Sequence, residues 1–323
     1  MSSRLLDDLR ARIPRAAERV APRVRRTPIV PSERLSGLAG CEVLLKLESL
    51  QTTGSFKLRG ALARLLALDP LPERVVAAST GNHGAAVAEA ARSVGARARV
   101  FAPRGADEEK LARVERLGAE VVRVEGVDCV DAEVAARAEA EERGVPYVSP
   151  YNDLDVISGA AGVGLEIVAD TAPCDLVAVA VGGGGLIAGV AAGLEAWPEA
   201  RVLGCSPERS ATMMRSVEAG RIVADEGLAT LSDATAGGLE EGALTLALCR
   251  ELVDAWVTVP EERIAAEMRS TLLEDRVVAE GAAAVATAGL VAAVQSAPER
   301  PRRALAVVCG GNVSAATLAG VLA

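Results

Sequence analysis

The chain contains 323 residues, half of which are hydrophobic, and it carries a formal net charge of −9. This length is enough for two domains, and the apolar content is enough to build a large core without metals or disulfides. The acidic balance argues against nucleic acid and anionic membranes as partners, because both attract a basic surface. The six cysteines are scattered, and the charged N-terminal segment has no apolar signal region, so we expect a reduced, cytoplasmic protein.

Short apolar segments alternate along the chain with longer segments rich in Ala, Leu, Glu and Arg. Segments that are apolar almost throughout are typical of strands buried on both faces of a mainly parallel sheet. The longer segments between them are expected to form crossover helices, so the sequence predicts an α/β fold. The predicted strands are 74–80, 98–103, 119–124, 176–183, 200–207 and 304–311. A cluster of Pro, Asn and Asp at 149–155 marks an expected domain boundary.

Residues 176–194 form an uncharged run near the length of a membrane span. Four consecutive glycines, 182–185, stand in the middle of this run, and glycine is a poor residue for a helix interior. We therefore expect a buried strand, a glycine turn and a buried helix there, not a transmembrane segment.

Lysine occurs at only three positions, 46, 57 and 110. An enzyme that forms a Schiff base between a side-chain amine and a carbonyl group would use one of these lysines, because arginine stays protonated. Lys110 lies in the charged segment 106–118, which predicts a solvent-facing helix, and Lys46 lies in a strand-like segment where a carboxylate partner is expected. Lys57 follows TTGSF, where a glycine turn meets the start of a helix. By itself, Lys57 also fits a surface lysine at a helix N-terminus.

His83 is the only histidine, so multi-histidine metal sites are excluded and a Ser-His-Asp triad would need His83 as its base. It lies in the sequence STGNHG, which follows a predicted strand and opens a predicted helix. Backbone N–H groups at such a helix start bind anions, and the Asn82 side chain adds an amide for a cofactor oxygen. A simple helix cap is the alternative interpretation of this turn.

Two further motifs also follow predicted strands. The glycines at 182–185 would expose successive N–H groups to a phosphate, although a tight turn is the simpler alternative. They lack the Lys-Ser/Thr of a P-loop and the acidic residue of a dinucleotide site, so nucleotide binding is weakly supported. The sequence CGGN at 309–312 ends the last strand, at the sheet edge where α/β proteins usually bind ligands.

These motifs occur in the order TTGSFKLRGA, STGNHG, tetraglycine and CGGN, between about Thr27 and Asn312. Together they resemble the fold-type II enzymes that depend on pyridoxal 5′-phosphate (PLP), in particular serine/threonine dehydratases and serine racemases. The resemblance implies two open, mainly parallel αβα domains of the tryptophan synthase β-like architecture. Residues 1–73 and 153–323 would form the large PLP-binding domain, and 74–152 a small mobile domain that closes over the substrate. Homodimers are common in this family, so we expect a homodimer by analogy.

The resemblance also assigns roles to residues. Lys57 would be the catalytic lysine and would carry PLP as a Schiff base, Phe56 would stack near the ring, and Asn82 would contact the ring hydroxyl. Glu280 would line the ring, and Cys309 would face the pyridine nitrogen, where many relatives carry Ser. The phosphate would be held by Gly182, Gly183, Gly184, Gly185 and Leu186. The substrate carboxylate would be bound by Ser79, Thr80, Gly81, Asn82 and His83.

The implied reaction removes the β-hydroxyl of L-threonine, L-serine or a related small hydroxy-amino acid and yields a 2-oxo acid and ammonia, as in amino-acid catabolism. Ser206 stands where some relatives carry a Glu that binds Mg²⁺ or Ca²⁺, so no metal site is expected. Residues 231–245 depart from the usual Ala-Asp-Gly pattern, which leaves the substrate open. The alternatives are a serine racemase, since Thr80 supplies a hydroxyl, a hydroxyaspartate or hydroxyectoine-type ammonia-lyase, and a non-catalytic ligand-binding α/β protein.

Overall fold

The computed structural model describes residues 2–125, 129–224 and 226–323. Its larger sheet has the strand order β1-β2-β9-β6-β7-β8. The five strands from β2 to β8 pair in parallel, and β1 pairs with β2 in the antiparallel sense. These strands are β1 (Ile29–Pro31), β2 (Glu42–Leu47), β6 (Leu176–Ala180), β7 (Arg201–Pro207), β8 (Ala255–Val259) and β9 (Arg303–Val308).

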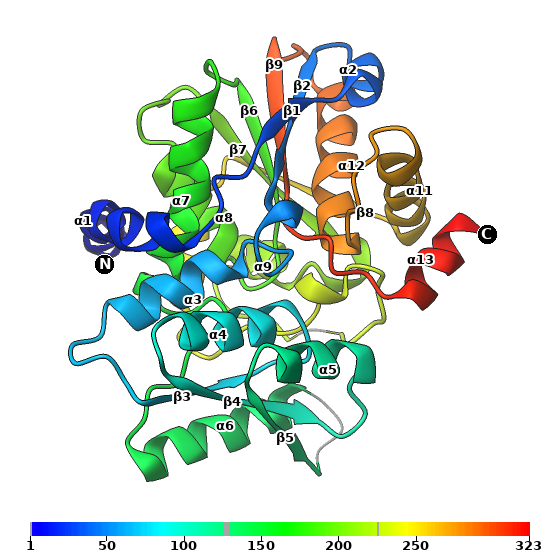
Figure 1. Cartoon of the computed structure of the whole chain (residues 1–323). Coiled ribbons are helices and arrows are strands. Elements are labelled where there is room, and N and C mark those ends of the chain that lie inside the picture. Colours follow the sequence, from blue (N-terminus) through cyan, green and yellow to red (C-terminus); the bar gives the residue numbers. More distant parts are fainter. Residues whose placement is uncertain (1, 126–128, 225) are drawn as a thin grey trace.

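The smaller sheet lies within residues 74–152 and is parallel throughout, in the order β3-β4-β5. It stands between α4 and α5 on one face and α6 on the other (Figure 1). Alternation along β3 explains these layers: Val75 and Ala77 pack with α4, whereas Val76 packs with α6. The elements are β3 (Arg74–Ala78), α4 (Asn82–Ser93), β4 (Arg97–Pro103), α5 (Glu108–Arg116), β5 (Glu120–Val124) and α6 (Cys129–Arg143).

Helices cover both faces of the larger sheet, with α7 and α8 on one side and α12 on the other (Figure 1). The α12 segment is apolar around its whole circumference, and it is buried along most of its length, as this composition requires. Helices α7 and α8 pack closely because a side chain at Gly164 would meet the Val190 carbonyl oxygen at 2.4 Å. These three helices are α7 (Leu154–Asp170), α8 (Gly185–Gly193) and α12 (Gly281–Ser296).

The remaining elements connect and flank these layers. Helix α3, which begins at Lys57, runs between the two sheets (Figure 1). The remaining α-helices are α1 (Ser2–Val20), α2 (Glu33–Ala39), α3 (Lys57–Leu66), α9 (Thr212–Ala219), α10 (Leu244–Leu252), α11 (Glu261–Leu273) and α13 (Ala315–Leu322). The short 3-10 turns are η1 (Ala21–Arg23), η2 (Glu48–Leu50), η3 (Glu208–Ser210) and η4 (Asp233–Thr235).

The predicted α/β class is confirmed, and each of the six predicted strands corresponds to an observed one. The two edge strands, β1 and β8, were outside that set: β1 spans only three residues, and β8 is mostly half-buried and lacks the fully apolar run of the central strands. Among the described residues, no helix has both the length and the apolar character needed to cross a membrane. Residues 176–194 instead form β6, a glycine loop and α8. The division into a large and a small mobile domain stays a prediction.

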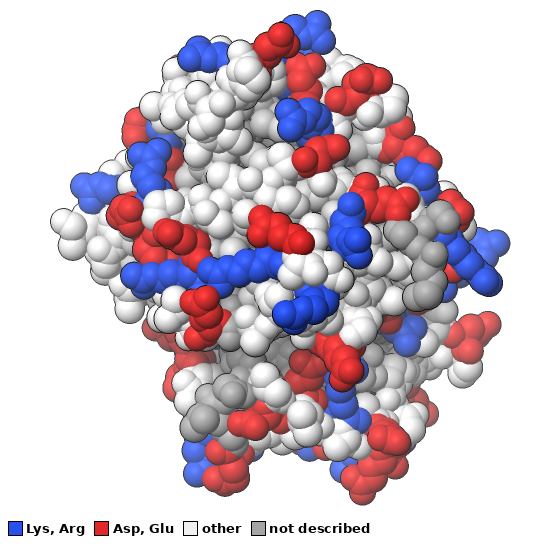
Figure 2. Space-filling view, turned by 180° about the vertical axis from the view of Figure 1, so that it is seen from behind, with Lys and Arg blue, Asp and Glu red and all other residues white. Residues whose placement is uncertain are grey.

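Charged side chains of both signs lie close together on the rear face of the molecule (Figure 2). Exposed ion pairs of the protein include that of Arg123 with Glu108 at 2.6 Å. Exposed pairs of this kind contribute only about 0–1 kcal/mol each to stability. The polar contacts that matter for the site are therefore the buried ones.

Candidate active site

A cavity of about 350 Å³ is lined by loops and helix ends from both sheets. Every residue assigned to cofactor or substrate from the sequence lines this one cavity. The motifs meet there because each follows the carboxyl end of a parallel strand: β3 precedes 79–83, β6 precedes 182–186 and β9 precedes Cys309. The structure thus brings the residues together, and their individual roles remain proposals.

Lys57 is the first residue of α3, and its side chain faces the cavity. The preceding loop is fixed by a hydrogen bond from the Phe56 N–H to the Cys309 carbonyl at 3.0 Å. Lys57 Nζ donates to the Pro150 carbonyl at 2.8 Å and lies 5.1 Å from the centre of the Phe56 ring. Enclosure by protein lowers the pKa of the Lys57 amine to about 8, although Cys309 and Glu280 oppose this shift. About a tenth of this amine is therefore unprotonated at pH 7, far more than for an ordinary lysine.

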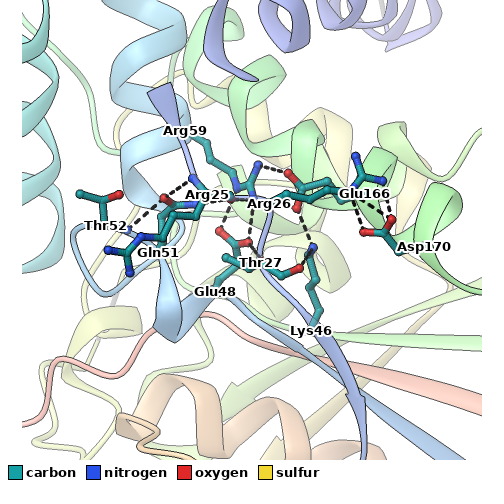
Figure 3. A network of polar contacts seen from close by, with 10 residues as sticks. All are labelled: Arg25, Arg26, Thr27, Lys46, Glu48, Gln51, Thr52, Arg59, Glu166 and Asp170. Atoms are coloured by element: carbon teal, nitrogen blue, oxygen red, sulfur yellow. Dashed lines mark hydrogen bonds and ion pairs between the residues drawn. The ribbon is translucent and has the colours of Figure 1, made fainter. Parts of the chain in front are cut away.

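A largely buried group of polar side chains, which we call the Arg59 network, is formed by Thr27, Lys46, Glu48, Arg59 and Glu166 (Figure 3). Arg59 donates to both oxygens of Glu48 at 2.8 Å and to Glu166 at 2.7 and 2.9 Å. Lys46 Nζ donates to Glu166 at 2.6 Å, so its predicted carboxylate partner is confirmed. Two cations meet two carboxylates, and these contacts tie α3 to η2 and α7, and β2 to α7, two residues beyond Lys57.

The glycine loop at 182–185 passes through a space too narrow for side chains. A Cβ at Gly183 would lie 2.4 Å from the Tyr151 ring, and one at Gly182 would lie 2.9 Å from the Thr235 backbone. Gly184 has a left-handed backbone (φ 84°) and caps α8 without a side-chain hydrogen bond. The loop therefore offers a cradle of backbone N–H groups at the positive end of α8, which fits a phosphate.

The loop at 79–83 presents backbone groups at the start of α4. Ser79 is held to the end of β4 by a hydrogen bond from its N–H to the Phe101 carbonyl at 2.9 Å. His83 is buried, and its Nε2 lies 2.8 Å from the Val148 carbonyl, so Nε2 carries the proton and donates. Burial lowers the pKa of His83 to about 3. A neutral His83 engaged with the backbone is not a free base, and this loop is left with N–H groups and the Thr80 hydroxyl for a ligand.

Glu280 lies at the start of α12 and is only 4 % exposed. Its Oε1 accepts from Asn82 Nδ2 at 2.8 Å, and its Oε2 accepts from the Asn312 N–H at 3.1 Å. Burial raises the pKa of Glu280 to about 7, while the two hydrogen bonds act in the opposite direction. Cys309 is also buried at the cavity wall, and burial raises the pKa of its thiol well above the usual range.

Sequence reasoning missed several charged residues of the cavity wall. The charged segment 106–118 predicts a solvent-facing helix, but the Lys110 and Arg113 side chains on α5 line the cavity. Lys110 Nζ, on α5 beside the smaller sheet, forms an ion pair with Asp233 of η4 at 2.5 Å. The only signal in the sequence was the spacing of apolar Leu111 and Val114, which places one face of the helix against the interior.

Comparisons with known proteins fit this geometry. The family model described as "Pyridoxal-phosphate dependent enzyme" matches residues 20–310. The L-threonine ammonia-lyase of Thermotoga maritima is 40% identical over 90% of this chain and 72% of its own length. The catabolic L-threonine dehydratase of Escherichia coli K12 is 36% identical over 92% of this chain and 91% of its own.

Two solved structures are similar to this chain in fold as well as in sequence. The threonine deaminase of T.th. has a TM-score of 0.86 and 38% identity, covering 94% of this chain and 98% of its own. Maize serine racemase has a TM-score of 0.89 and 30% identity, covering 96% of this chain and 95% of its own.

Proposed function

Since the chain belongs to the family of pyridoxal-phosphate-dependent enzymes, we propose that it eliminates the β-hydroxyl of L-threonine or L-serine and releases a 2-oxo acid and ammonia. The single observation that carries this proposal is Lys57. It is enclosed in the cavity with its pKa lowered to about 8, and it shares that cavity with an anion cradle at 182–185. The relatives named threonine dehydratase or threonine ammonia-lyase support the choice of substrate class.

The residues present fit PLP. Lys57 would hold it covalently, the glycine loop and Leu186 would hold its phosphate, and Phe56, Asn82, Glu280 and Cys309 would surround its ring. When bound, PLP supplies an electron sink for the charge that develops at the substrate Cα. Burial keeps the Cys309 thiol uncharged at neutral pH, so this residue places no negative charge against the ring.

The chain's own residues would then carry out two tasks. Backbone N–H groups of the 79–83 loop, at the positive end of α4, would bind the substrate carboxylate and orient Cα. Lys57 would remove the proton from Cα, because an amine with a pKa of about 8 is in part unprotonated at neutral pH and still basic enough to accept a proton. Enclosure of the cavity would keep bulk water away from Lys57 Nζ during this transfer.

Racemisation of serine is a second candidate because the Thr80 hydroxyl lines the cavity. Racemisation requires a second proton-transfer group besides Lys57, and a serine racemase is among the similar structures. A hydroxyl without a relay is a weak acid, and we place racemisation as a minor side reaction of an enzyme that mainly eliminates.

We further propose that the protein acts as a homodimer in the cytoplasm. A reducing compartment agrees with the free thiols of Cys41, Cys174, Cys205, Cys249 and Cys309. Light scattering of the purified protein measures the mass directly, and a mass of one chain at micromolar concentration would refute the dimer.

The test of function is 2-oxo acid formation from a panel of L-threonine, L-serine, threo-3-hydroxyaspartate and L-alanine. We expect turnover of L-threonine or L-serine and none of L-alanine, which has no β-hydroxyl. Lys57→Ala is expected to lose at least about a thousandfold in turnover while it keeps its fold by circular dichroism. Absence of any 2-oxo acid from all hydroxy-amino acids would contradict the proposal.

A further inference from the structure

Arg113 reaches the cavity from α5, a helix of the smaller-sheet part, and it is half-buried. Its Nη1 donates to Asn312 Oδ1, and its Nη2 donates to the Thr53 carbonyl at 2.9 Å. Asn312 and Thr53 belong to the loops next to Cys309 and Lys57. Among the described residues, the hydrogen bonds of Arg113 end on these two partners and not on Asn82 or Glu280.

These contacts fix the orientation of the Asn312 amide. A guanidinium group only donates, so the atom of Asn312 that faces Arg113 must be the oxygen. The Thr53 carbonyl only accepts, and it receives Asn312 Nδ2 at 2.9 Å. A flipped amide would face donor against donor at Arg113 and acceptor against acceptor at Thr53.

The same logic continues to the next side chain. Asn312 Nδ2 also donates to Asn82 Oδ1 at 2.6 Å, which leaves Asn82 Nδ2 to donate to Glu280 at 2.8 Å. Glu280 receives a second donor, the Asn312 N–H. Both carboxylate oxygens therefore accept, which favours the ionised form of Glu280.

Space around this chain of contacts is restricted. A Cβ at Gly54 would lie 2.3 Å from Asn312 Oδ1, and a Cβ at Gly310 would lie 2.3 Å from Glu280 Oε1. Glycine at both positions admits the two side chains, and the tight fit leaves the amides little room to rotate. The charged and titratable groups that act on Glu280 are Lys57, Lys110, Arg113, Asp233 and Cys309.

We propose that Arg113 is a positioning residue, which aligns the Asn312 and Asn82 amides toward Glu280 and stabilises the Glu280 carboxylate through them. Asn82 thereby keeps its second N–H for a ring oxygen of the cofactor, and the ring meets a negative charge at Glu280. This inference rests on the proposed function only for the identity of the cofactor. Electrostatic attraction between Glu280 and Arg113 is consistent with it, since Glu280 acts to raise the pKa of Arg113 against the effects of burial and Arg116.

The experiment titrates the visible absorbance of the PLP-bound, full-length protein between pH 5.5 and 9, a range chosen at roughly two units around the Glu280 pKa. The transition that belongs to Glu280 is the one that disappears in Glu280→Gln. We compare wild type with Arg113→Ala, Arg113→Lys and the matched control Arg116→Ala, which removes an exposed cation from the same helix. A parallel titration follows thermal unfolding of each variant.

Arg113→Ala is expected to move the Glu280 midpoint upward by roughly half a pH unit or more, because Asn312 loses the donor that orients its amide and the Glu280 carboxylate loses a nearby cation. Arg113→Lys keeps the charge and should restore most of the wild-type midpoint, and Arg116→Ala should leave it unchanged. If Arg113→Ala fails to fold, Arg113→Met, which removes both the donor and the charge but keeps an unbranched apolar side chain, should show the same upward shift.

Two results would overturn the inference: an Arg113→Ala or Arg113→Met midpoint equal to that of Arg116→Ala, or a shift in Arg113→Lys as large as in Arg113→Ala. Failure of the proposed function looks different. A wild-type protein without a visible cofactor band refutes PLP binding itself, whereas a normal band without threonine turnover refutes only the substrate and leaves the Arg113 test in force.

Discussion

The Arg59 network and the Asn82–Asn312–Glu280 group each contain a buried carboxylate, but they balance its charge in different ways. In the Arg59 network two cations touch two carboxylates directly, at 2.6–2.9 Å. Burial lowers the pKa of Arg59, but its contacts with Glu48 and Glu166 outweigh burial and raise it overall. Glu280 instead is separated from its cation Arg113 by two amides, and burial raises its pKa to about 7.

This difference separates a structural network from a functional one. Direct pairing with opposite charges holds the Arg59 side chain in place and anchors α3. A carboxylate that accepts hydrogen bonds only from neutral donors can instead gain and lose its proton near neutral pH. The first region therefore fixes where Lys57 starts its helix, and the second supplies an adjustable charge at the proposed cofactor ring.

The largest expected effect comes from breaking the direct pairs. Arg59→Met leaves Glu48 and Glu166 without their main donor, and we expect a loss of about 3–5 kcal/mol in the free energy of unfolding. Arg64→Met is the control on the same helix, because its partners Asp153 and Asp155 and Arg64 itself are partly exposed. It should lose only about 0–1 kcal/mol in urea unfolding. Equal losses in the free energy of unfolding of Arg59→Met and Arg64→Met would show that the direct pairs of Arg59 stabilise the protein no more than partly exposed pairs do.

The next effect is the pH dependence that Glu280 contributes to stability. Its pKa rises from the ordinary 4.5 to about 7 on folding, so the unfolded chain releases this proton first. The Glu280 contribution to stability should therefore fall as pH rises from about 4.5 to about 7, by at most ~3 kcal/mol. His83, whose pKa is lowered to about 3, contributes with the opposite sign below about pH 6.5, so the Glu280 contribution is read as the difference between the wild type and Glu280→Gln.

Glu280→Gln should remove this fall, which urea unfolding at pH 5 and pH 8 would measure. Glu48→Gln in the Arg59 network should instead lower stability at both pH values, because Arg59 loses an acceptor. An equal change in stability between pH 5 and pH 8 in the wild type and in Glu280→Gln would show that Glu280 does not titrate in this range.

A smaller effect is expected at the glycine cradle. Gly183→Ala places a methyl group against the Tyr151 ring and should weaken PLP binding by roughly tenfold. Gly37→Ala is the control, since a Cβ there meets nothing within 4 Å. Titration of each protein with PLP, followed by absorbance, gives the dissociation constants. Unchanged affinity in Gly183→Ala would mean that the phosphate lies elsewhere.

The smallest effect concerns Thr80. Chiral analysis of L-serine turnover should show pyruvate as the main product and a trace of D-serine, which Thr80→Ala should remove without much change in pyruvate. If D-serine forms faster than pyruvate in the wild type and disappears in the variant, the protein is a racemase.

The strands and the site loops could be predicted because they depend on local patterns. Apolar runs identify buried strands, and the motifs at 79–83, 182–186 and 309 each follow such a run. Parallel strands then bring their carboxyl ends to the same edge, so the cavity follows from the pattern.

Contacts between distant charged residues could not be predicted in this way. Lys46 required a carboxylate partner, but nothing in the sequence selects Glu166, which is 120 positions away. Arg113 stands among charged residues typical of a solvent face, and only the packing of α5 turns it toward Asn312. Long-range pairing of this kind depends on how helices and sheets pack, which a residue pattern does not record.

The central claim is that Lys57 holds the cofactor, and the scarcity of lysine makes a direct measurement possible. Reduction of the PLP-bound protein with borohydride followed by proteolysis and mass spectrometry identifies the lysine that bears the pyridoxyl group. Only Lys46, Lys57 and Lys110 are available. We expect the pyridoxyl group on Lys57, in the peptide that contains TTGSFK. A label on Lys110 or Lys46, or on no lysine at all, would contradict it.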